Sequence, residues 1–266
     1  MTSFLPDLTP LELETDPKGC CARLYESDAV RWLLDEQLHP GGEQLTRRLA
    51  ELAGVAPGRR VLDVACGSGA TALLLARELD CVVVGVDLGA RAIEQARRAT
   101  HAGVRASFLL GDAEALPLPD ASFDVAMSEC SLCTFPDNPR AITEMARVVR
   151  PGGSIAIADV TADLDALPAQ LRSAAARVAC VADARSAGAY AALLRDAGCE
   201  PLAIEPHDAE LRAMADRVEA RLRLARMLAP PGDEREGIRE AAALSRLAID
   251  AIARGTLGYA LITARV

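Results

Sequence analysis

Two cysteines, Cys130 and Cys133, lie three residues apart in the segment SECSLCTFPD, directly after a run with the pattern of a buried strand. Thiolates are soft ligands that bind thiophilic elements. The pair could therefore serve packing, zinc binding, a redox reaction or the binding of a substrate. A redox pair is the weakest of these, because a redox CxxC usually begins a helix and FPDNP follows here.

The other cysteines of the eight in the chain fall into two groups. Free cysteine is among the most buried residue types. We expect simple burial for Cys66, Cys81 and Cys199. The N-terminal arm and a helix predicted after the fifth strand could bring further thiols to Cys130: Cys20, Cys21 and Cys180. A zinc site built from the first two with Cys130 and Cys133 is an alternative, although an adjacent pair is a strained way to give one ion two ligands.

The elements that must position these thiols alternate between strand and helix patterns. Such alternation indicates βαβ units and a parallel sheet covered by helices on both faces. The expected strands are 61–65, 81–88, 106–112, 123–129, 154–162, 200–208 and 258–266. The expected helices are 25–38, 43–55, 71–79, 90–100, 138–150, 166–181, 188–197, 208–227 and 234–254, after an irregular arm from residue 1 to about 20.

We predict one domain in three parts: an arm or lid at 1–44, a cofactor-binding core at 45–165, and substrate-side helices and closing strands at 166–266. A helical insertion precedes the last strand, and a separate C-terminal subdomain is the alternative. Clustered Lys and Arg and stacking aromatics would be needed for nucleic-acid binding. A net charge of -9 and 3% aromatics argue against it.

The sequence contains no run of 18 apolar residues, so we predict no membrane-spanning helix. The first twenty residues are acidic and lack the apolar stretch of a secretory signal. We therefore expect a cytoplasmic protein without membrane partners. In that compartment, cysteines are more often free thiols or ligands than disulfides.

The segment VLDVACGSGA carries Gly67 and Gly69 between a strand and a helix, where glycine allows close approach of the backbone to a ligand. Asp63 precedes this turn. Asp87 follows it by about 20 residues, which suits hydrogen bonding to a ribose. Asp112 ends the third strand and could accept a hydrogen bond from the exocyclic amine of an adenine. A nicotinamide dinucleotide is the alternative ligand, but the third glycine of its GxGxxG motif is absent.

Four segments, VLDVACGSG, VVVGVDL, LLGDAEALPLPDASFDVAMS and ITEMARVVRPGGSIAIADV, resemble the class I S-adenosylmethionine-dependent methyltransferases in order and spacing. The resemblance implies a Rossmann-like, doubly wound, mostly parallel seven-stranded sheet. It implies S-adenosylmethionine as cofactor and no catalytic metal. The cofactor-binding residues that it implies are Asp63, Ala65, Gly67, Gly69, Asp87, Leu88, Asp112, Ala113 and Glu129.

The cysteine positions further resemble the arsenite methyltransferase branch of this family. There, a cysteine follows the fourth strand shortly before a Pro-Asp step, as Cys130 does, and another lies on a helix after the fifth strand, as Cys180 does. The resemblance implies three arsenic ligands, Cys130, Cys180 and Cys21 or Cys20, and leaves Cys133 as a possible fourth sulfur. The CC pair, HPGGEQLT and the helical part at 208–254 depart from that branch.

Three thiolates could hold a trivalent arsenic in a pyramidal geometry, which leaves the lone pair of arsenic free to attack the methyl group. Because arsenic is itself the nucleophile, positioning would supply most of the acceleration. Selenium, mercury or methylarsenical substrates are alternatives, and reducing thiols are expected partners. Methylation of an organic acceptor at O, N or C would require a base and an aromatic-lined pocket. His39 and His207 are the candidate bases. A non-enzymatic zinc- or metalloid-binding protein is the third hypothesis. The chain could be a monomer or a dimer.

Overall fold

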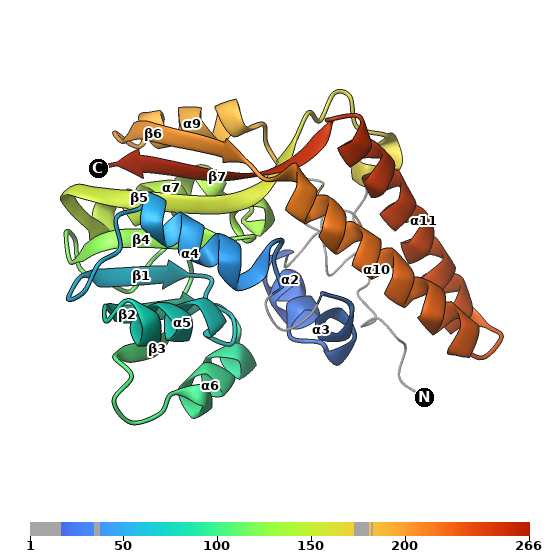
Figure 1. The fold of residues 1–266 in the computed structure, drawn as a ribbon, viewed down its shortest axis with the longest axis horizontal. Helices are drawn as coiled ribbons and strands as arrows, with labels where there is room; N and C mark the ends of the chain where they lie inside the picture. The colour runs from blue at the N-terminus through green and yellow to red at the C-terminus, as the bar shows by residue number, and fades with distance from the viewer. Residues whose placement is uncertain (1–16, 35–37, 173–180, 182) are drawn as a thin grey trace.

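The computed structural model describes residues 17–34, 38–172, 181 and 183–266, although not the side chains of residues 17, 20, 21 and 234. A seven-stranded sheet with the order β3-β2-β1-β4-β5-β7-β6 forms its centre (Figure 1). The strands are β1 Arg60–Val64, β2 Val82–Asp87, β3 Ala106–Leu110, β4 Phe123–Glu129, β5 Val149–Ala162, β6 Glu200–Pro206 and β7 Leu257–Arg265.

The sheet is mostly parallel, as predicted. Strands β1 to β5 pair in parallel, whereas β7 runs antiparallel to both of its neighbours, β5 and β6. The first strand lies between β2 and β4, so the strand order reverses beside it. In an open α/β sheet, ligands bind at such a point, outside the carboxyl ends of the strands.

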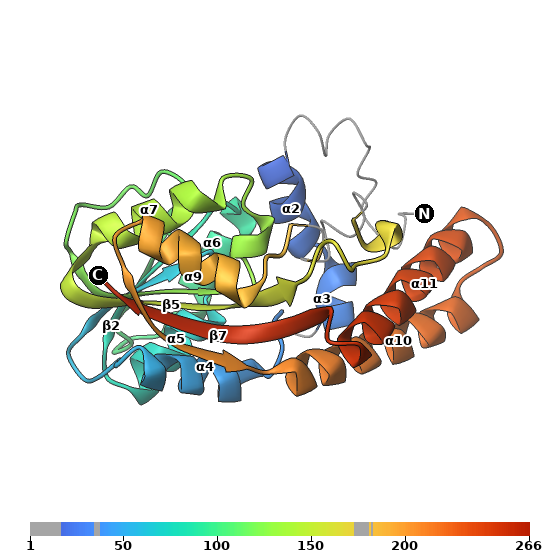
Figure 2. The ribbon, with the colours of Figure 1, turned by 90° about the horizontal axis from the view of Figure 1, so that it is seen from above.

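Helices cover both faces of the sheet (Figure 2). One apolar cluster joins the sheet to α4, α5 and α6, and a second joins its other face to α7 and α9. These helices are α4 Gly42–Leu52, α5 Ala70–Glu78, α6 Ala90–Ala99, α7 Asn138–Val148 and α9 Ala187–Asp196. The start of α7 is encoded locally: Asp137 accepts the backbone N–H of Arg140 at 3.1 Å, and Pro139 occupies the first turn.

Two long helices, α10 Asp208–Leu228 and α11 Asp233–Ala253, form a hairpin between β6 and β7. The hairpin extends beyond the end of the sheet (Figure 2). Its apolar face packs against α3, Asp28–Leu34, where Leu33 meets Leu222 and Ala225. The predicted helical insertion before the last strand is therefore present, and it holds α3 near the carboxyl ends of the strands.

Three predicted segments differ. The helix predicted at 25–38 is represented by α3, which covers Asp28–Leu34, while 35–37 lie outside the described residues. The irregular arm was predicted to reach about residue 20, but α2 already begins at Pro17 and runs to Tyr25. Proline is well suited to a first helical position because its missing N–H would have no partner there. Within the predicted helix 166–181, the described residues contain a short 3₁₀ segment, η2 Ala169–Arg172, and 173–180 lie outside the described residues.

Candidate functional site

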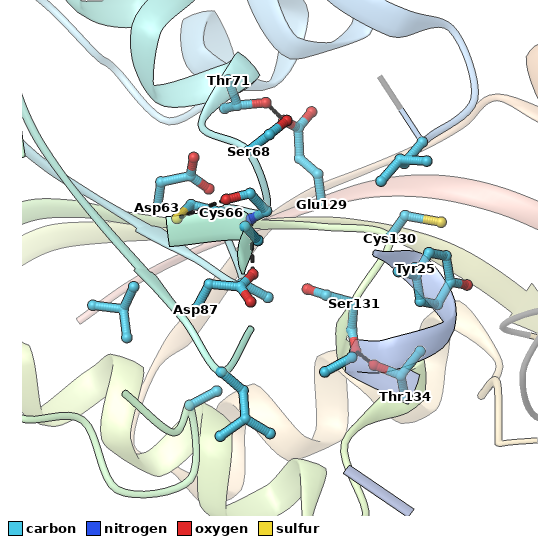
Figure 3. Close-up of a pocket in the computed structure, with 18 of the residues that line it drawn as sticks. Tyr25, Asp63, Cys66, Ser68, Thr71, Asp87, Glu129, Cys130, Ser131 and Thr134 are labelled. Carbon is cyan, nitrogen blue, oxygen red and sulfur yellow. Dashed lines mark hydrogen bonds between the residues drawn. The ribbon is translucent and has the colours of Figure 1, made fainter. Parts of the chain in front are cut away.

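A cavity lies at the carboxyl ends of β1, β2 and β4 (Figure 3). Its walls come from the glycine-rich turn after β1, the ends of β2 and β3, the segment after β4, and α2 together with the residues that precede α4. This is the edge of an open α/β sheet at which ligands bind. Segments far apart in the chain therefore meet around one space.

The glycine-rich turn presents its backbone to this cavity. Gly67 and Gly69 adopt left-handed φ angles of 52° and 83°. A Cβ at Gly69 would lie 2.7 Å from the ring of Phe108, so only glycine lets α5 start this close to the sheet. At Gly67 nothing lies within 4 Å of where a Cβ would be. The turn therefore leaves room for a ligand to approach the backbone closely at Gly67.

Asp63 is a buried carboxylate that lacks a full set of partners. It is 3% exposed, and its Oδ2 has no hydrogen-bond partner. Burial, together with the charges of Glu129 and Asp87, raises its pKa well above the ordinary value, against the opposing effect of the Ala72 amide. A buried anion of this kind calls for a cation, and a ligand ammonium would supply it.

Asp87 ends β2 and holds the turn in place. Its Oδ2 accepts the backbone N–H of Gly67 at 2.8 Å, and its Oδ1 accepts that of Gly89 at 2.7 Å. Burial raises the pKa of this carboxyl, while the two amides act in the opposite direction. Each oxygen keeps a further lone pair for a ligand. The neighbouring Leu88 is 42% exposed and lines the cavity, which gives it an apolar wall.

Asp112 lies just after β3 and is paired with Lys18 on α2, whose Nζ is 2.7 Å from Oδ2. The other oxygen, Oδ1, accepts the backbone N–H of Glu114 at 2.9 Å. Burial alone would raise the pKa of Asp112, but the Lys18 ammonium and this amide reverse the effect and lower it. Ala113 beside it is buried and lines the cavity. The predicted adenine-binding residues thus lie together under α2.

Glu129, at the end of β4, is the centre of a polar cluster. The hydroxyl of Thr71 donates to its Oε2 at 2.6 Å, and the hydroxyl of Thr46 donates to its Oε1 at 3.0 Å. The Nε2 atom of His39 lies 4.0 Å from the same carboxylate. Two hydroxyl donors fix the orientation of this carboxylate, which is 5% exposed and lines the cavity.

Cys130 is partly exposed and lines the cavity, with Tyr25 of α2 and Ser131 also in its wall (Figure 3). Its φ angle is 50°, a left-handed conformation that is uncommon outside glycine. Its backbone N–H donates to the carbonyl of Ala158 at 2.7 Å, which fixes the turn. The chain therefore turns sharply as it leaves β4, with the first thiol of the CxxC in the cavity wall.

Cys133 lies elsewhere. It is 0% exposed and belongs to the apolar cluster beneath the cavity. The 3₁₀ turn η1, Leu132–Thr134, carries it inward, and its N–H donates to Asp159 Oδ2 at 3.2 Å. This position corrects the expectation that Cys133 could be a fourth sulfur for the substrate. Cys66, Cys81 and Cys199 are buried, as expected.

The remaining predicted thiols are only partly described. The backbone of Cys20 and Cys21 lies in α2, between Lys18 and Ala22, two residues that line the cavity. Cys180 lies outside the described residues. Among the side chains that the structure describes, no group of three His, Cys, Asp or Glu residues is arranged to hold a metal ion. No described helix is long and apolar enough to cross a membrane.

Several residues in or beside the cavity were not singled out from the sequence. Thr46 and Thr71 reach Glu129 from positions 83 and 58 residues away in the chain. His39, by contrast, was one of two candidate bases, and its side chain is 9% exposed and lines the cavity. Lys18 carried no motif at all, although it is the only lysine in the sequence. Its being the only lysine was the one feature of the sequence that could have drawn attention to it.

Comparison with known proteins gives a consistent family assignment. Residues 62–157 match a family model described as a methyltransferase domain. The 27-O-demethylrifamycin SV methyltransferase of Amycolatopsis mediterranei is 38% identical over 199 residues, which are 67% of this chain and 72% of that enzyme. An arsenite methyltransferase of Halobacterium salinarum is 34% identical over 174 residues, covering 62% of this chain but 43% of that enzyme.

Among solved structures, the [4+2]-cyclase SpnF superimposes with a TM-score of 0.73 at 26% identity, over 92% of this chain and 94% of that one. That protein is a cyclase by name, so the fold alone does not fix the reaction. The reaction must be argued from the cavity and from the relatives that share more of its sequence.

Proposed function

The chain belongs to the S-adenosylmethionine-dependent methyltransferases, and on this premise we propose that its methyl acceptor is trivalent arsenic, or a similar thiophilic species, bound by cysteine thiolates. The enzyme class and the cofactor follow from the family. The acceptor and the roles of individual residues are our proposal, and they rest on the cavity.

The cavity fits S-adenosylmethionine, which supplies an electrophilic methyl group when bound. We assign the unpaired Oδ2 of Asp63 to the ammonium of the methionine part, because it is a buried anion without a cation. The open backbone at Gly67 suits the same part. We assign Asp87 to the ribose hydroxyls, and Asp112 with Ala113 to the adenine. With the cofactor held by these residues, its methyl group would be available to an acceptor at the segment after β4.

One observation carries the acceptor assignment: Cys130 lines the cavity at the end of β4, and α2, which carries Cys20 and Cys21, forms another wall of the same cavity. A sulfur at this position can present a bound atom to the transferable methyl group. The likeness to the halobacterial arsenite methyltransferase, and the place of Cys180 in the sequence, support the same assignment.

The chemistry requires little from the protein beyond positioning. Soft thiolates bind trivalent arsenic, whose lone pair is the nucleophile, so no general base is needed at the methyl-transfer step. In-line placement of nucleophile and methyl group would supply most of the acceleration. This requirement agrees with a cavity whose thiol segment is held by a fixed turn at Cys130.

The test is turnover of arsenite with S-adenosylmethionine and a reducing thiol, with methylated arsenic as the readout. We expect Cys130→Ser to lose turnover and to weaken arsenite binding. Cys81→Ser is the matched control, because Cys81 is completely buried and outside the cavity, and we expect it to keep turnover. Absence of turnover in the parent, with equal arsenite binding by Cys130→Ser, would refute the proposal.

A second candidate is O-methylation of an organic hydroxyl, favoured by the rifamycin relative and by His39. Nδ1 of His39 lies 3.1 Å from the carbonyl oxygen of Pro40, so Nδ1 is the donor and Nε2 is left as an acceptor in the cavity. A neutral imidazole in this tautomer can take a proton from a hydroxyl. Methylation of a hydroxyl acceptor that survives Cys130→Ser but not His39→Ala would select this candidate.

A further inference from the structure

Helix α2 contributes Lys18, Ala22 and Tyr25 to the wall of the cavity, and Glu26, which directly follows the helix, lines it too. Helix α2 lies beside the carboxyl ends of the central strands (Figure 1). The helix has only nine residues, too few to be stable by itself in water. Its position must therefore come from tertiary contacts, and those contacts fix where the thiol-bearing backbone of Cys20 and Cys21 lies.

The contacts at the start of α2 come from Lys18. Its ammonium lies 2.7 Å from Oδ2 of Asp112 and also forms an ion pair with Glu114. The Glu114 side chain is 12% exposed, so this pair is better shielded from water than a surface pair. A lysine ammonium is a compact charge with three donors, which suits two carboxylates approached from different directions.

Glu114 extends this contact to the other thiol segment. Its Oε1 accepts the backbone N–H of Asp137 at 2.8 Å. Asp137 caps α7 and ends the segment that begins with Cys130 after β4. One carboxylate therefore joins α2 on one side to the loop after β4 on the other. The two walls that carry Cys130 and the Cys20–Cys21 pair meet at Lys18 and Glu114.

The contact at the end of α2 comes from Glu26. Its Oε1 accepts the backbone N–H of Ala92 at 3.0 Å, in the first turn of α6. A carboxylate there satisfies a free helix amide and interacts favourably with the helix dipole. The start and the end of α2 are thus fastened beside Asp112 and Asp87, at the carboxyl ends of the neighbouring strands β3 and β2.

We propose that Lys18 is a positioning residue for methyl transfer: its bridge to Asp112 and Glu114 holds α2 and the segment after β4 together, so that the acceptor site forms over an intact adenine subsite. This inference rests on the proposed function for the identity of the acceptor. It goes beyond that function by linking recognition of the adenine to the placement of the acceptor thiols.

The test compares Lys18→Met, which keeps the length of the side chain, with Lys18→Arg, which keeps its charge. We expect the Met variant to raise the KM for arsenite about fivefold, to change kcat less, and to speed amide hydrogen exchange in α2 about fivefold, as loss of two partly exposed ion pairs implies. We expect the Arg variant to stay within about twofold of the parent, because the charge is retained.

Arg105→Met is the matched control, since it removes a surface ion pair with Asp80 outside the cavity and should leave both readouts unchanged. Unchanged exchange in α2 of Lys18→Met would overturn the inference, and so would equal impairment of the Met and Arg variants. The exchange measurement needs no acceptor. If the parent does not methylate arsenite, the proposed function fails while hydrogen exchange still decides the role of Lys18.

Discussion

Replacing Asp63 by Asn removes the buried negative charge that, in this account, binds the ammonium of the cofactor. The carboxyl is 3% exposed, its Oδ2 has no partner, and Glu129 and Asp87 add repulsion. We expect opposite effects on binding and on stability. Binding of S-adenosylmethionine should weaken, because its ammonium loses the negative partner. The free protein should become more stable, because it no longer buries a carboxylate without a cation.

Removing one member of a buried charge pair weakens binding by about 2–5 kcal/mol. Because Asn keeps an acceptor oxygen, we take the lower figure and expect about 30-fold weaker binding of S-adenosylmethionine. The Tm of the free protein should rise, by about 2–4 °C for each kcal/mol regained.

The sign of the pH dependence follows from the raised pKa of Asp63. A carboxyl whose folded-state pKa is raised contributes stability that is fully present below its unfolded pKa and is lost as pH rises through the folded pKa. The free parent should therefore lose stability over that interval, and the Asn variant should lose less. Binding of the cationic ammonium requires the ionised form, so the parent should release a proton on binding and bind more weakly as pH falls.

Isothermal titration calorimetry in buffers of different ionisation enthalpy measures both the affinity and the released proton, and thermal unfolding measures the Tm. Asp124→Asn is the matched control, because Asp124 is a buried carboxylate on β4 that lies outside the cavity. Its oxygens contact the Arg60 amide and Arg150, so its loss should lower the Tm and leave affinity unchanged. Affinity of Asp63→Asn within twofold of the parent, with an unchanged Tm, would refute the reasoning.

Three further predictions concern the turn and the polar cluster. Thr71→Val removes a hydrogen bond to the Glu129 carboxylate and should weaken S-adenosylmethionine binding about tenfold by calorimetry, with little change in Tm. Cys133→Ala should lower the free energy of unfolding by about 1 kcal/mol in urea titrations without altering arsenite affinity, because this thiol is buried in the core. Gly69→Ala should lower it by about 1–3 kcal/mol in the same titrations, since the residue has a φ of 83° and its Cβ would clash with Phe108.

The parts of the fold that follow from local patterns were predictable. The strand FDVAMSE has the predicted bounds in β4, since its apolar residues are bounded by turn residues on both sides. Asp63 and Asp87 were predictable as cavity residues because each lies at or next to the carboxyl end of a strand, and parallel strands bring these ends to one edge.

The parts held by distant contacts were not predictable. Helix α2 depends on Lys18 reaching Asp112, 94 residues away, and no local pattern encodes that pair. The CxxC spacing likewise left open whether Cys133 joins Cys130 as a ligand or packs. Cys133 lies in a 3₁₀ turn of three residues, so Cys130 lines the cavity and Cys133 packs into the core. Residue spacing along the chain does not reveal such a rotation.

The central claim is that cysteine thiolates hold the methyl acceptor beside Cys130. X-ray absorption spectroscopy at the arsenic edge, on the protein with bound arsenite, measures the atoms around arsenic directly. The account predicts a first shell of sulfur alone in the parent, and a shell with one sulfur fewer in Cys130→Ser. A shell of oxygen alone in the parent, or a shell unchanged by the substitution, would contradict it.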